Sequence, residues 1–339
     1  MRLLGFDEFL SEKFSLLIDA RSPAEYDDLH IKNALNFYSL NDEERERVGT
    51  LYNHNKFEAK LLGAALICHN ASLHLDAISK HIKPYNKLGI YCSRGGQRSG
   101  ALGHILSEIG YEVYKLEGGF KNYKANIARY LEQDLYERFS IKLISLSGNT
   151  ASGKTRLLSI LKPSIDLEAL ARHLGSSFGG IKGEQPKQKN FDVELFYKLR
   201  QNSGLVFVEA ESRNIGKITL PLGLHKAMQE AFIVSCSASF DIRVSRCVED
   251  YKNIDKSIFF KALNAIKAYT SKAFVDNLAL LYERDDLESV AALLLSEYYD
   301  KVYKKPLKID LEINLDNLEK ARDELLALKA HLEGRYHEY

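Results

Sequence analysis

The sequence has few cysteines, almost no net charge and no long apolar run. Its cysteines, Cys68, Cys92, Cys236 and Cys247, form no C-x-x-C pair, which argues against a disulfide framework and a zinc site. Because the net charge is only +1, a polyanion would have to bind a local basic patch and not the overall field. No run approaches the roughly 20 apolar residues that span a bilayer. We therefore expect a cytoplasmic protein.

The chain has 339 residues, with 45% hydrophobic and 27% charged residues, which suits a soluble protein of two globular domains. Short apolar runs alternate with helical stretches up to about residue 123, as in an α/β domain with a mostly parallel sheet. The strands are expected at 14–20, 88–92 and 111–116, and the helices at 73–82 and 100–110. A helical stretch at 120–139 leads to the next strand. We place the domains at 1–138 and 139–339.

The second domain is predicted to be a P-loop α/β domain. A strand at 141–147 precedes a Gly-rich turn and a helix at 154–162, and further buried strands are expected at 205–212 and 231–238. From about residue 239 the pattern becomes helical, which predicts a C-terminal helical subdomain. Its helices are expected at 240–251, 257–269, 287–303 and 315–332. The sequence contains no fixed-period repeat.

One cysteine lies in a setting that favours nucleophilic chemistry. Cys92 follows a buried-strand candidate and precedes an amphipathic helix, and its loop contains Arg94, Gly95, Gly96 and Arg98. The glycines let backbone N–H groups converge on one point, and the helix N-terminus adds partial positive charge. We expect the Cys92 thiol to be largely ionised at neutral pH and to attack sulfur, selenium or phosphorus. The other cysteines lack such surroundings and are interpreted as structural.

A second loop matches the phosphate-binding pattern G-x-x-x-x-G-K-[ST] between a strand and a helix. Its residues are Gly148, Asn149, Thr150, Ala151, Ser152, Gly153, Lys154 and Thr155. Backbone amides would cradle phosphates, Lys154 would neutralise outer phosphate charge, and Thr155 would bind Mg²⁺ if the reaction uses it. A later buried strand ends in acid, so Glu209 or Glu211 could serve a metal or order water. The sequence does not choose between these two carboxylates.

Segments 18–26, 30–37, 91–100 and 116–124 together resemble a rhodanese domain. In rhodaneses the loop cysteine carries a persulfide, and Asp19, Arg21 and His30 match the family's DxR and HI motifs. We interpret these residues as scaffold. Ser22 to Glu25 also reads as a capping box with a proline at the first helical position.

The C-x5-R spacing of Cys92 and Arg98 is shared with cysteine-dependent phosphatases and with tRNA 2-selenouridine synthases. Phosphatases usually place His before the cysteine, where this chain has Tyr91. The chain resembles the synthase family over about residues 15–235. The segments that carry this resemblance are 48–53, 166–168 with His173, 175–179, 185–189 and 209–216. It departs from the usual patterns at Leu29, Asn33 and Ala210.

The resemblance implies that geranyl diphosphate alkylates the sulfur of wobble 2-thiouridine in tRNA, after which selenophosphate replaces the sulfur by selenium. Lys154 would serve the diphosphate step and Cys92 the selenium step. The supporting residues are Asp166, His173, Glu209, Glu211 and Arg213, and the candidate Mg²⁺ ligands are Thr155 and Glu209.

The expected partners are tRNA and the two phosphorus-containing donors, with the chain acting as a monomer away from membranes. Basic residues that could contact RNA are Lys182, Lys187, Lys189, Arg213, Lys217, Lys301, Lys304 and Lys305. Two alternatives stay open. One is a P-loop kinase or ATPase with a regulatory rhodanese or phosphatase-like module, and the other is a non-catalytic RNA-binding adaptor.

Overall fold

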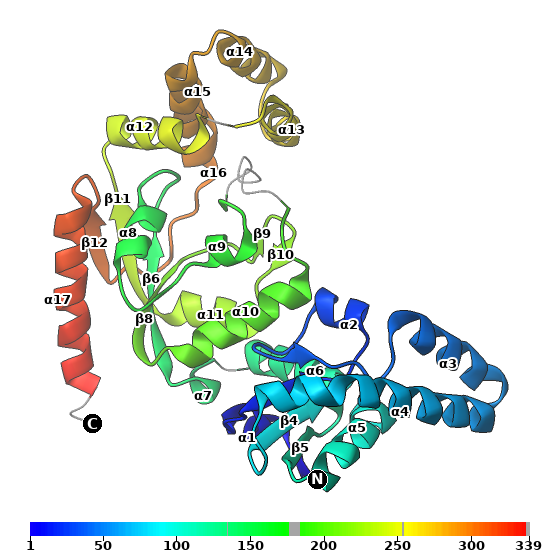
Figure 1. Ribbon diagram of the computed structural model, residues 1–339. Coiled ribbons are helices and arrows are strands. Elements are labelled where there is room, and N and C mark those ends of the chain that lie inside the picture. The colour runs from blue at the N-terminus through cyan, green and yellow to red at the C-terminus, as the bar shows by residue number, and fades with distance from the viewer. Residues whose placement is uncertain (134, 176–183, 253, 337–339) are drawn as a thin grey trace. The chain divides into compact units, whose positions relative to one another are not determined.

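The structure, a computed structural model, describes residues 1–133, 135–175, 184–252 and 254–336 (Figure 1). It divides into two compact units, Met1–Ile127 and Ala128–Tyr339. The division falls within helix α6 (Gly119–Glu132), earlier than the boundary at residue 138 that the sequence suggested.

The first unit is an α/β fold around a parallel five-stranded sheet of order β1-β5-β4-β2-β3. The strands are β1 (Arg2–Leu4), β2 (Leu16–Asp19), β3 (Leu35–Asn36), β4 (Lys87–Tyr91) and β5 (Glu112–Leu116). The helices are α1 (Phe6–Ser11), α2 (Pro23–Asp28), α3 (Asp42–His54), α4 (Lys56–His81), α5 (Gln97–Glu108) and α6. The capping box that begins α2 is confirmed, with Pro23 in its first turn.

Helix α4 is longer than the sequence suggested. By length and composition it could cross a membrane, with a mean hydropathy of 1.3 in its most apolar window, and 28% of that window is buried in the protein. The expectation that no stretch has this character was therefore wrong. His69, Asn70 and Ser72 interrupt the apolar run without adding acidic or lysine and arginine charge. Ala71 and Ile78 of α4 pack into the core of the first unit.

The second unit contains a parallel five-stranded sheet of order β12-β11-β6-β8-β7 and a two-stranded antiparallel ribbon, β9 and β10. The strands are β6 (Ile141–Ser147), β7 (Ser164–Ile165), β8 (Gly204–Glu209), β9 (Asn214–Ile215), β10 (Ile218–Thr219), β11 (Phe232–Ser237) and β12 (Leu311–Asn314). The helices of this part are α7 (Leu135–Arg138), α8 (Lys154–Ile160), α9 (Leu167–Ala171), α10 (Gln188–Gln201), α11 (Leu222–Glu230) and α17 (Leu318–Tyr336).

Strand β6 lies in the middle of this sheet, between β11 and β8. Almost all of its residues are buried, because a central parallel strand has both faces covered, which explains its continuous apolar run. Leu157 of α8 and Leu325 of α17 share a buried cluster with residues of the sheet, while α10 and α11 pack on the other side (Figure 1). The carboxyl end of β6 thus opens into the Gly-rich loop that precedes α8.

A helical subdomain follows β11, as predicted from about residue 239. It contains α12 (Phe240–Tyr251), α13 (Lys256–Ile266), α14 (Lys272–Glu283), α15 (Leu287–Leu294), the π-helical turn η2 (Leu295–Tyr299) and α16 (Asp300–Val302). Helices α12 to α15 and η2 share one apolar core. Helix α14 was not foreseen, and neither was β12, which returns the chain to the edge of the sheet beside β11.

Candidate functional site

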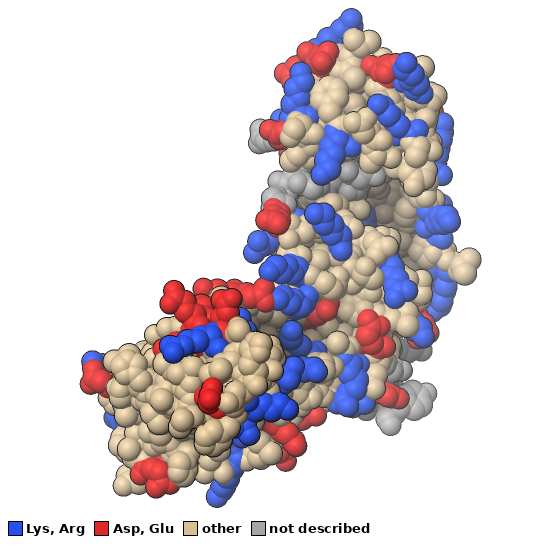
Figure 2. Space-filling view, turned by 90° about the vertical axis from the view of Figure 1, so that its right-hand side faces the viewer, with Lys and Arg blue, Asp and Glu red and all other residues tan. Residues whose placement is uncertain are grey.

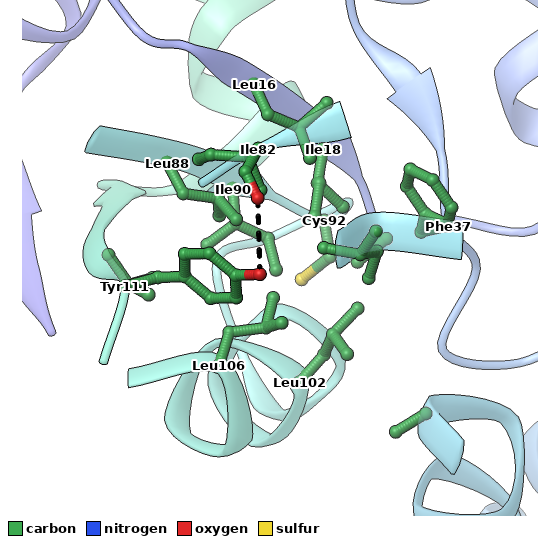
Figure 3. Packing of buried hydrophobic residues seen from close by; sticks show 14 residues of the cluster. Leu16, Ile18, Phe37, Ile82, Leu88, Ile90, Cys92, Leu102, Leu106 and Tyr111 are labelled. Atoms are coloured by element: carbon green, nitrogen blue, oxygen red, sulfur yellow. Dashed lines mark hydrogen bonds between the residues drawn. The ribbon is translucent and has the colours of Figure 1, made fainter. Parts of the chain in front are cut away.

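The loop of Cys92 joins β4 to α5, as the sequence predicted. The Cys92 side chain is only 3% exposed and belongs to the apolar core, where Figure 3 shows its sulfur on the side of Leu102. The Ser99 hydroxyl donates a hydrogen bond to Sγ across 3.1 Å. Ser99 is a contact that sequence reasoning missed.

The start of α6 holds the backbone of this loop. Phe120 N–H donates to the Cys92 carbonyl across 2.8 Å, and Lys121 N–H donates to the Ser93 carbonyl across 2.9 Å. Gly119 has a φ of +60°, and a side chain there would strike the Cys92 carbonyl. The segment 116–124, which carries part of the rhodanese resemblance, therefore shapes the cysteine loop.

The two arginines of the loop differ in their surroundings. Arg94 is exposed, whereas Arg98 Nη1 lies 2.5 Å from Oε2 of Glu25 in the capping box of α2. Burial would raise the pKa of Glu25, but the hydrogen bond and charge of Arg98 outweigh it and lower that pKa. Gly95 supplies the left-handed turn, with a φ of +64°, and Gly96 is the N-cap of α5. An anion that reaches Arg98 must therefore compete with Glu25.

Asp19 and Arg21 form a buried ion pair beneath this loop. Their Oδ2 and Nη2 atoms are 2.6 Å apart, and Arg21 Nη2 also donates to the Leu29 carbonyl. The Arg21 guanidinium lies 3.7 Å from the ring centroid of Phe120. His30 stacks on Tyr26, with ring centroids 3.8 Å apart. The contacts of Asp19, Arg21 and His30 thus connect strands, loops and helices within the first unit.

The other cysteines differ from one another. Cys236 on β11 and Cys247 on α12 are buried, and burial raises the pKa of each thiol to about 12. Both suit a structural role. Cys68 is exposed on α4, so it does not contribute to the core as a structural cysteine would.

The predicted phosphate loop, Gly148 to Thr155, connects β6 to α8. Lys154 Nζ donates to the carbonyls of Gly148 and Asn149, across 2.8 and 3.3 Å. Gly153 has a φ of +103°, and a Cβ there would lie 2.6 Å from Nη1 of Arg246. The loop therefore requires glycine at this position for both its backbone conformation and its packing.

Side chains of the helical subdomain donate hydrogen bonds to the phosphate loop, and the sequence did not predict these contacts. Arg243 Nε on α12 donates to the Thr150 carbonyl across 3.0 Å, and Arg246 Nη1 donates to the Ser152 carbonyl across 2.6 Å. Asp300 accepts from Arg243 across 2.6 Å. The sequence did contain one signal for this contact: Arg243 and Arg246 are three residues apart on α12, so that they lie on the same side of the helix.

Asn149 of the phosphate loop also contacts the helical subdomain, because its Nδ2 donates to Asp300 Oδ1 across 2.8 Å. Burial would raise the pKa of Asp300, but the hydrogen bonds and charge of Arg243 lower it below its usual value. Asp300 therefore stays ionised and ties the loop to the subdomain.

Three carboxylates gather beside the loop. One oxygen each of Glu168, Glu209 and Glu211 lies within 4.8 Å of the others, and Thr155 Oγ1 donates to Glu168 Oε2 across 3.4 Å. Burial, and then the charge of Glu209, raises the pKa of Glu211 to about 7, although Lys154 opposes this. Oxygen donors of this kind suit Mg²⁺. Glu209 and Glu211, between which the sequence did not choose, therefore belong to the same cluster, together with Glu168.

The other supporting residues lie on the loops around this carboxylate cluster. The Asp166 side chain caps α9 by accepting from Ala169 N–H across 2.7 Å. Burial lowers the pKa of His173, and Arg213 is exposed. Gln185 Nε2 donates to the carbonyls of Ala171 and Ile215, so the segment 185–189 joins the end of α9 to the β9–β10 ribbon.

Most of the basic residues proposed to contact RNA are exposed. This applies to Lys187, Arg213, Lys217, Lys301, Lys304 and Lys305, and Lys301 pairs with Glu297 on its own helical stretch. On the face in Figure 2, some Lys and Arg side chains lie next to one another and others lie singly among uncharged residues. Lys182 and residues 176–179 lie outside the described residues. The RNA contacts stay a prediction.

Two family models match the chain. Residues 6–126 match the rhodanese-like domain, and residues 141–284 match the AAA domain of tRNA 2-selenouridine synthase. The two matches contain the cysteine loop and the phosphate loop, respectively.

Curated relatives named tRNA 2-selenouridine synthase are similar over much of the chain. The protein of Hydrogenovibrio crunogenus is 32% identical, over 88% of this chain and 92% of the relative. The Pseudomonas syringae protein is 35% identical over 69% of this chain, and the Nitrosomonas europaea protein is 37% identical over the same share. The chain spans 65% and 63% of the length of these last two relatives.

Proposed function

The chain belongs to the tRNA 2-selenouridine synthase family, and from this premise we propose that it converts wobble 2-thiouridine in tRNA to 2-selenouridine through an S-geranyl intermediate. One observation carries the proposal. The same chain holds a cysteine in a C-x5-R loop and a phosphate loop beside a carboxylate cluster. The proposed donors, geranyl diphosphate and selenophosphate, are both anions that contain phosphorus.

The phosphate loop would serve the first step. The thiouridine sulfur attacks C1 of the geranyl group, the C1–O bond breaks, and its electron pair leaves with diphosphate. The pyrimidine loses its N3 proton. Loop amides and Lys154 would stabilise the negative charge that develops on the leaving group. In the structure Lys154 Nζ is held by loop carbonyls, from which it would turn to the phosphates.

The carboxylate cluster would accompany this step. With Thr155, it could hold Mg²⁺, which would supply further positive charge to the departing diphosphate. Without the ion, the pKa of Glu211 is raised to about 7, so that Glu211 can hold a proton near neutral pH. It is therefore a candidate acceptor for the proton released on alkylation.

The cysteine loop would serve the second step. Selenium replaces sulfur at C2, the C2–S bond breaks, and geranylthiol leaves. Water takes up the phosphoryl group of selenophosphate as phosphate, and N3 regains its proton. Cys92 and the backbone of its loop would receive selenophosphate, with Arg94 exposed nearby and Arg98 available once it leaves Glu25.

We assign tRNA as the macromolecular partner and the cytoplasm as the location, with the chain acting as a monomer. The relatives' names support tRNA modification. The exposed lysines and arginines of the second unit supply candidate phosphate contacts.

Mass spectrometry of tRNA nucleosides tests the proposal. Purified protein is incubated with thiolated tRNA, geranyl diphosphate and selenophosphate, and 2-selenouridine should form. Without selenophosphate, S-geranyl-2-thiouridine should accumulate. Unchanged 2-thiouridine together with ATP turnover in the absence of RNA would favour the kinase or ATPase alternative.

A further inference from the structure

Two buried arginines of helix α12 support the phosphate loop, and their charges are balanced differently. Arg243 and Arg246 are 6% and 7% exposed. Arg243 forms an ion pair with Asp300, whose Oδ1 lies 2.6 Å from Nη2. Arg246 donates instead to two backbone carbonyls, those of Ser152 in the loop and of Leu315, across 2.6 and 2.7 Å. Among the residues that the structure describes, no carboxylate forms an ion pair with Arg246.

Three carboxylates act on Arg246 at longer range, and each is engaged elsewhere. Glu249 and Asp250 pair with Arg156, across 2.6 and 2.7 Å, and Asp316 accepts from a backbone N–H across 2.8 Å. Burial and the charge of Arg156 lower the pKa of Arg246, although the three carboxylates oppose this change. Because a buried charge is costly without a counterion, an anion bound nearby would stabilise Arg246.

The phosphate loop presents polar groups that have no partner within the described part of the chain. The N–H groups of Ala151 and Gly153 donate to no acceptor there, and the Oγ atom of Ser152, a residue 1% exposed, makes no hydrogen bond there either. Ala151 and Gly153 have φ values of +59° and +103°, and left-handed residues in a turn direct neighbouring N–H groups toward one point. Because buried backbone donors are almost always paired, these groups suit a ligand that is rich in oxygen acceptors.

One peptide links Arg246 to this anion site. The Ser152 carbonyl and the Gly153 N–H belong to the same trans peptide, so they point in nearly opposite directions. By holding the carbonyl toward α12, Arg246 aims the N–H away from that helix. A charged donor on the oxygen also polarises the peptide and makes its N–H a stronger donor. Gly153 allows this contact, since a Cβ there would lie 2.6 Å from Nη1 of the arginine.

Arg243 makes the equivalent contact two residues earlier in the loop. Its Nε donates to the Thr150 carbonyl across 3.0 Å, which belongs to the peptide of the Ala151 N–H. Because Asp300 neutralises Arg243, this arginine orients its peptide without adding net charge. Arg246 both orients a peptide and adds a positive charge.

We propose that Arg246 is a positioning residue for the diphosphate: it orients the Gly153 N–H, and its charge is balanced by the bound anion instead of by a carboxylate. The inference rests on the proposed function, from which the identity of the anion is taken. When the C1–O bond of the allylic donor breaks, negative charge grows on the diphosphate. A fixed positive charge beside the loop would stabilise that leaving group more than the intact donor.

Calorimetric titration with inorganic diphosphate and with inorganic phosphate tests the inference. Arg246→Gln removes the charge, whereas Arg246→Lys keeps it but cannot hold both carbonyls. Arg246→Gln should lower the affinity for diphosphate at least about tenfold, or about 1.4 kcal/mol. It should lower the affinity for phosphate by a smaller factor, because phosphate carries less charge. Arg246→Lys should stay within about threefold of the unmodified protein. Lys252→Gln is the control, because it removes one positive charge from the exposed end of the same helix.

Rescue by lysine separates an effect of charge from a purely structural one. Equal losses in Arg246→Lys and Arg246→Gln would overturn the inference, as would equal losses in Arg246→Gln and Lys252→Gln. The melting temperature without ligand shows whether each variant folds. If Arg246→Gln does not fold, Arg246→Lys carries the test, and a loss above about tenfold in that variant would overturn the inference.

Geranyl transfer to thiolated tRNA, measured separately, distinguishes this inference from the proposed function. Diphosphate affinity that depends on the charge of Arg246, with no geranylated tRNA formed by the unmodified protein, would support the role of Arg246 and refute the proposed function. Normal transfer by Arg246→Gln with unchanged diphosphate affinity would refute the role of Arg246 and leave the function standing.

Discussion

The raised pKa of Glu211 should make the second unit less stable as the pH rises. The folded carboxyl releases its proton near pH 7, whereas the unfolded one does so near 4.5. The favourable contribution is therefore complete below pH 4.5 and is lost as the pH rises through 7. Linkage over this interval gives a loss of about 2 to 3 kcal/mol between pH 5 and 8. Glu211→Gln cannot ionise and should lack this loss.

Hydrogen-exchange mass spectrometry at increasing urea, in EDTA, would measure the unfolding free energy from peptides of β6 and β8. Glu211→Gln should gain stability over the unmodified protein at pH 8 and show little gain at pH 5. Glu230→Gln is the control, because Glu230 is exposed at the end of α11. Parallel pH profiles for the unmodified protein and Glu211→Gln would refute the reasoning.

Further predictions concern the thiols, the loop support and RNA. Brief alkylation of the folded protein should modify exposed Cys68 well before buried Cys236, whose pKa is about 12; equal rates by peptide mapping would contradict this. Arg243→Gln should lower the unfolding free energy by about 2 kcal/mol, because it leaves a partly buried carboxylate uncompensated. It should also weaken diphosphate binding in calorimetry, and a similar loss in exposed Lys252→Gln would contradict a specific role. RNA affinity should fall as salt increases, since phosphate contacts release counterions, and a flat slope would exclude a basic patch.

Much of the fold could be predicted because parallel strands that are covered on both faces have short, continuous apolar runs in the sequence, as in β6 and β4. The same reasoning did not find β12, since its four residues contain one buried side chain at the edge of the sheet. Helix α4 was only partly recognised, because polar residues such as Asn70 lie on its buried face. Its length depends on packing that a local pattern does not contain.

The two loops were recognisable because their chemistry depends on backbone groups and side chains within a few consecutive residues. The carboxylate cluster and the Arg243–Asp300 pair join positions that are distant in the chain, so only the folded sheet and helices bring them together. The contact of Arg98 with Glu25 was hidden for the same reason.

The central claim is that the phosphate loop serves geranylation and the cysteine loop serves selenium transfer. The products made by two variants test this claim most directly. Under single-turnover conditions with both donors, Lys154→Ala should leave mainly 2-thiouridine. Its geranylation rate should fall at least about tenfold, or about 1.4 kcal/mol of transition-state stabilisation. Cys92→Ser should geranylate normally and accumulate S-geranyl-2-thiouridine, because its hydroxyl stays protonated. Selenouridine formed at the normal rate by Cys92→Ser, or normal geranylation by Lys154→Ala, would contradict the account.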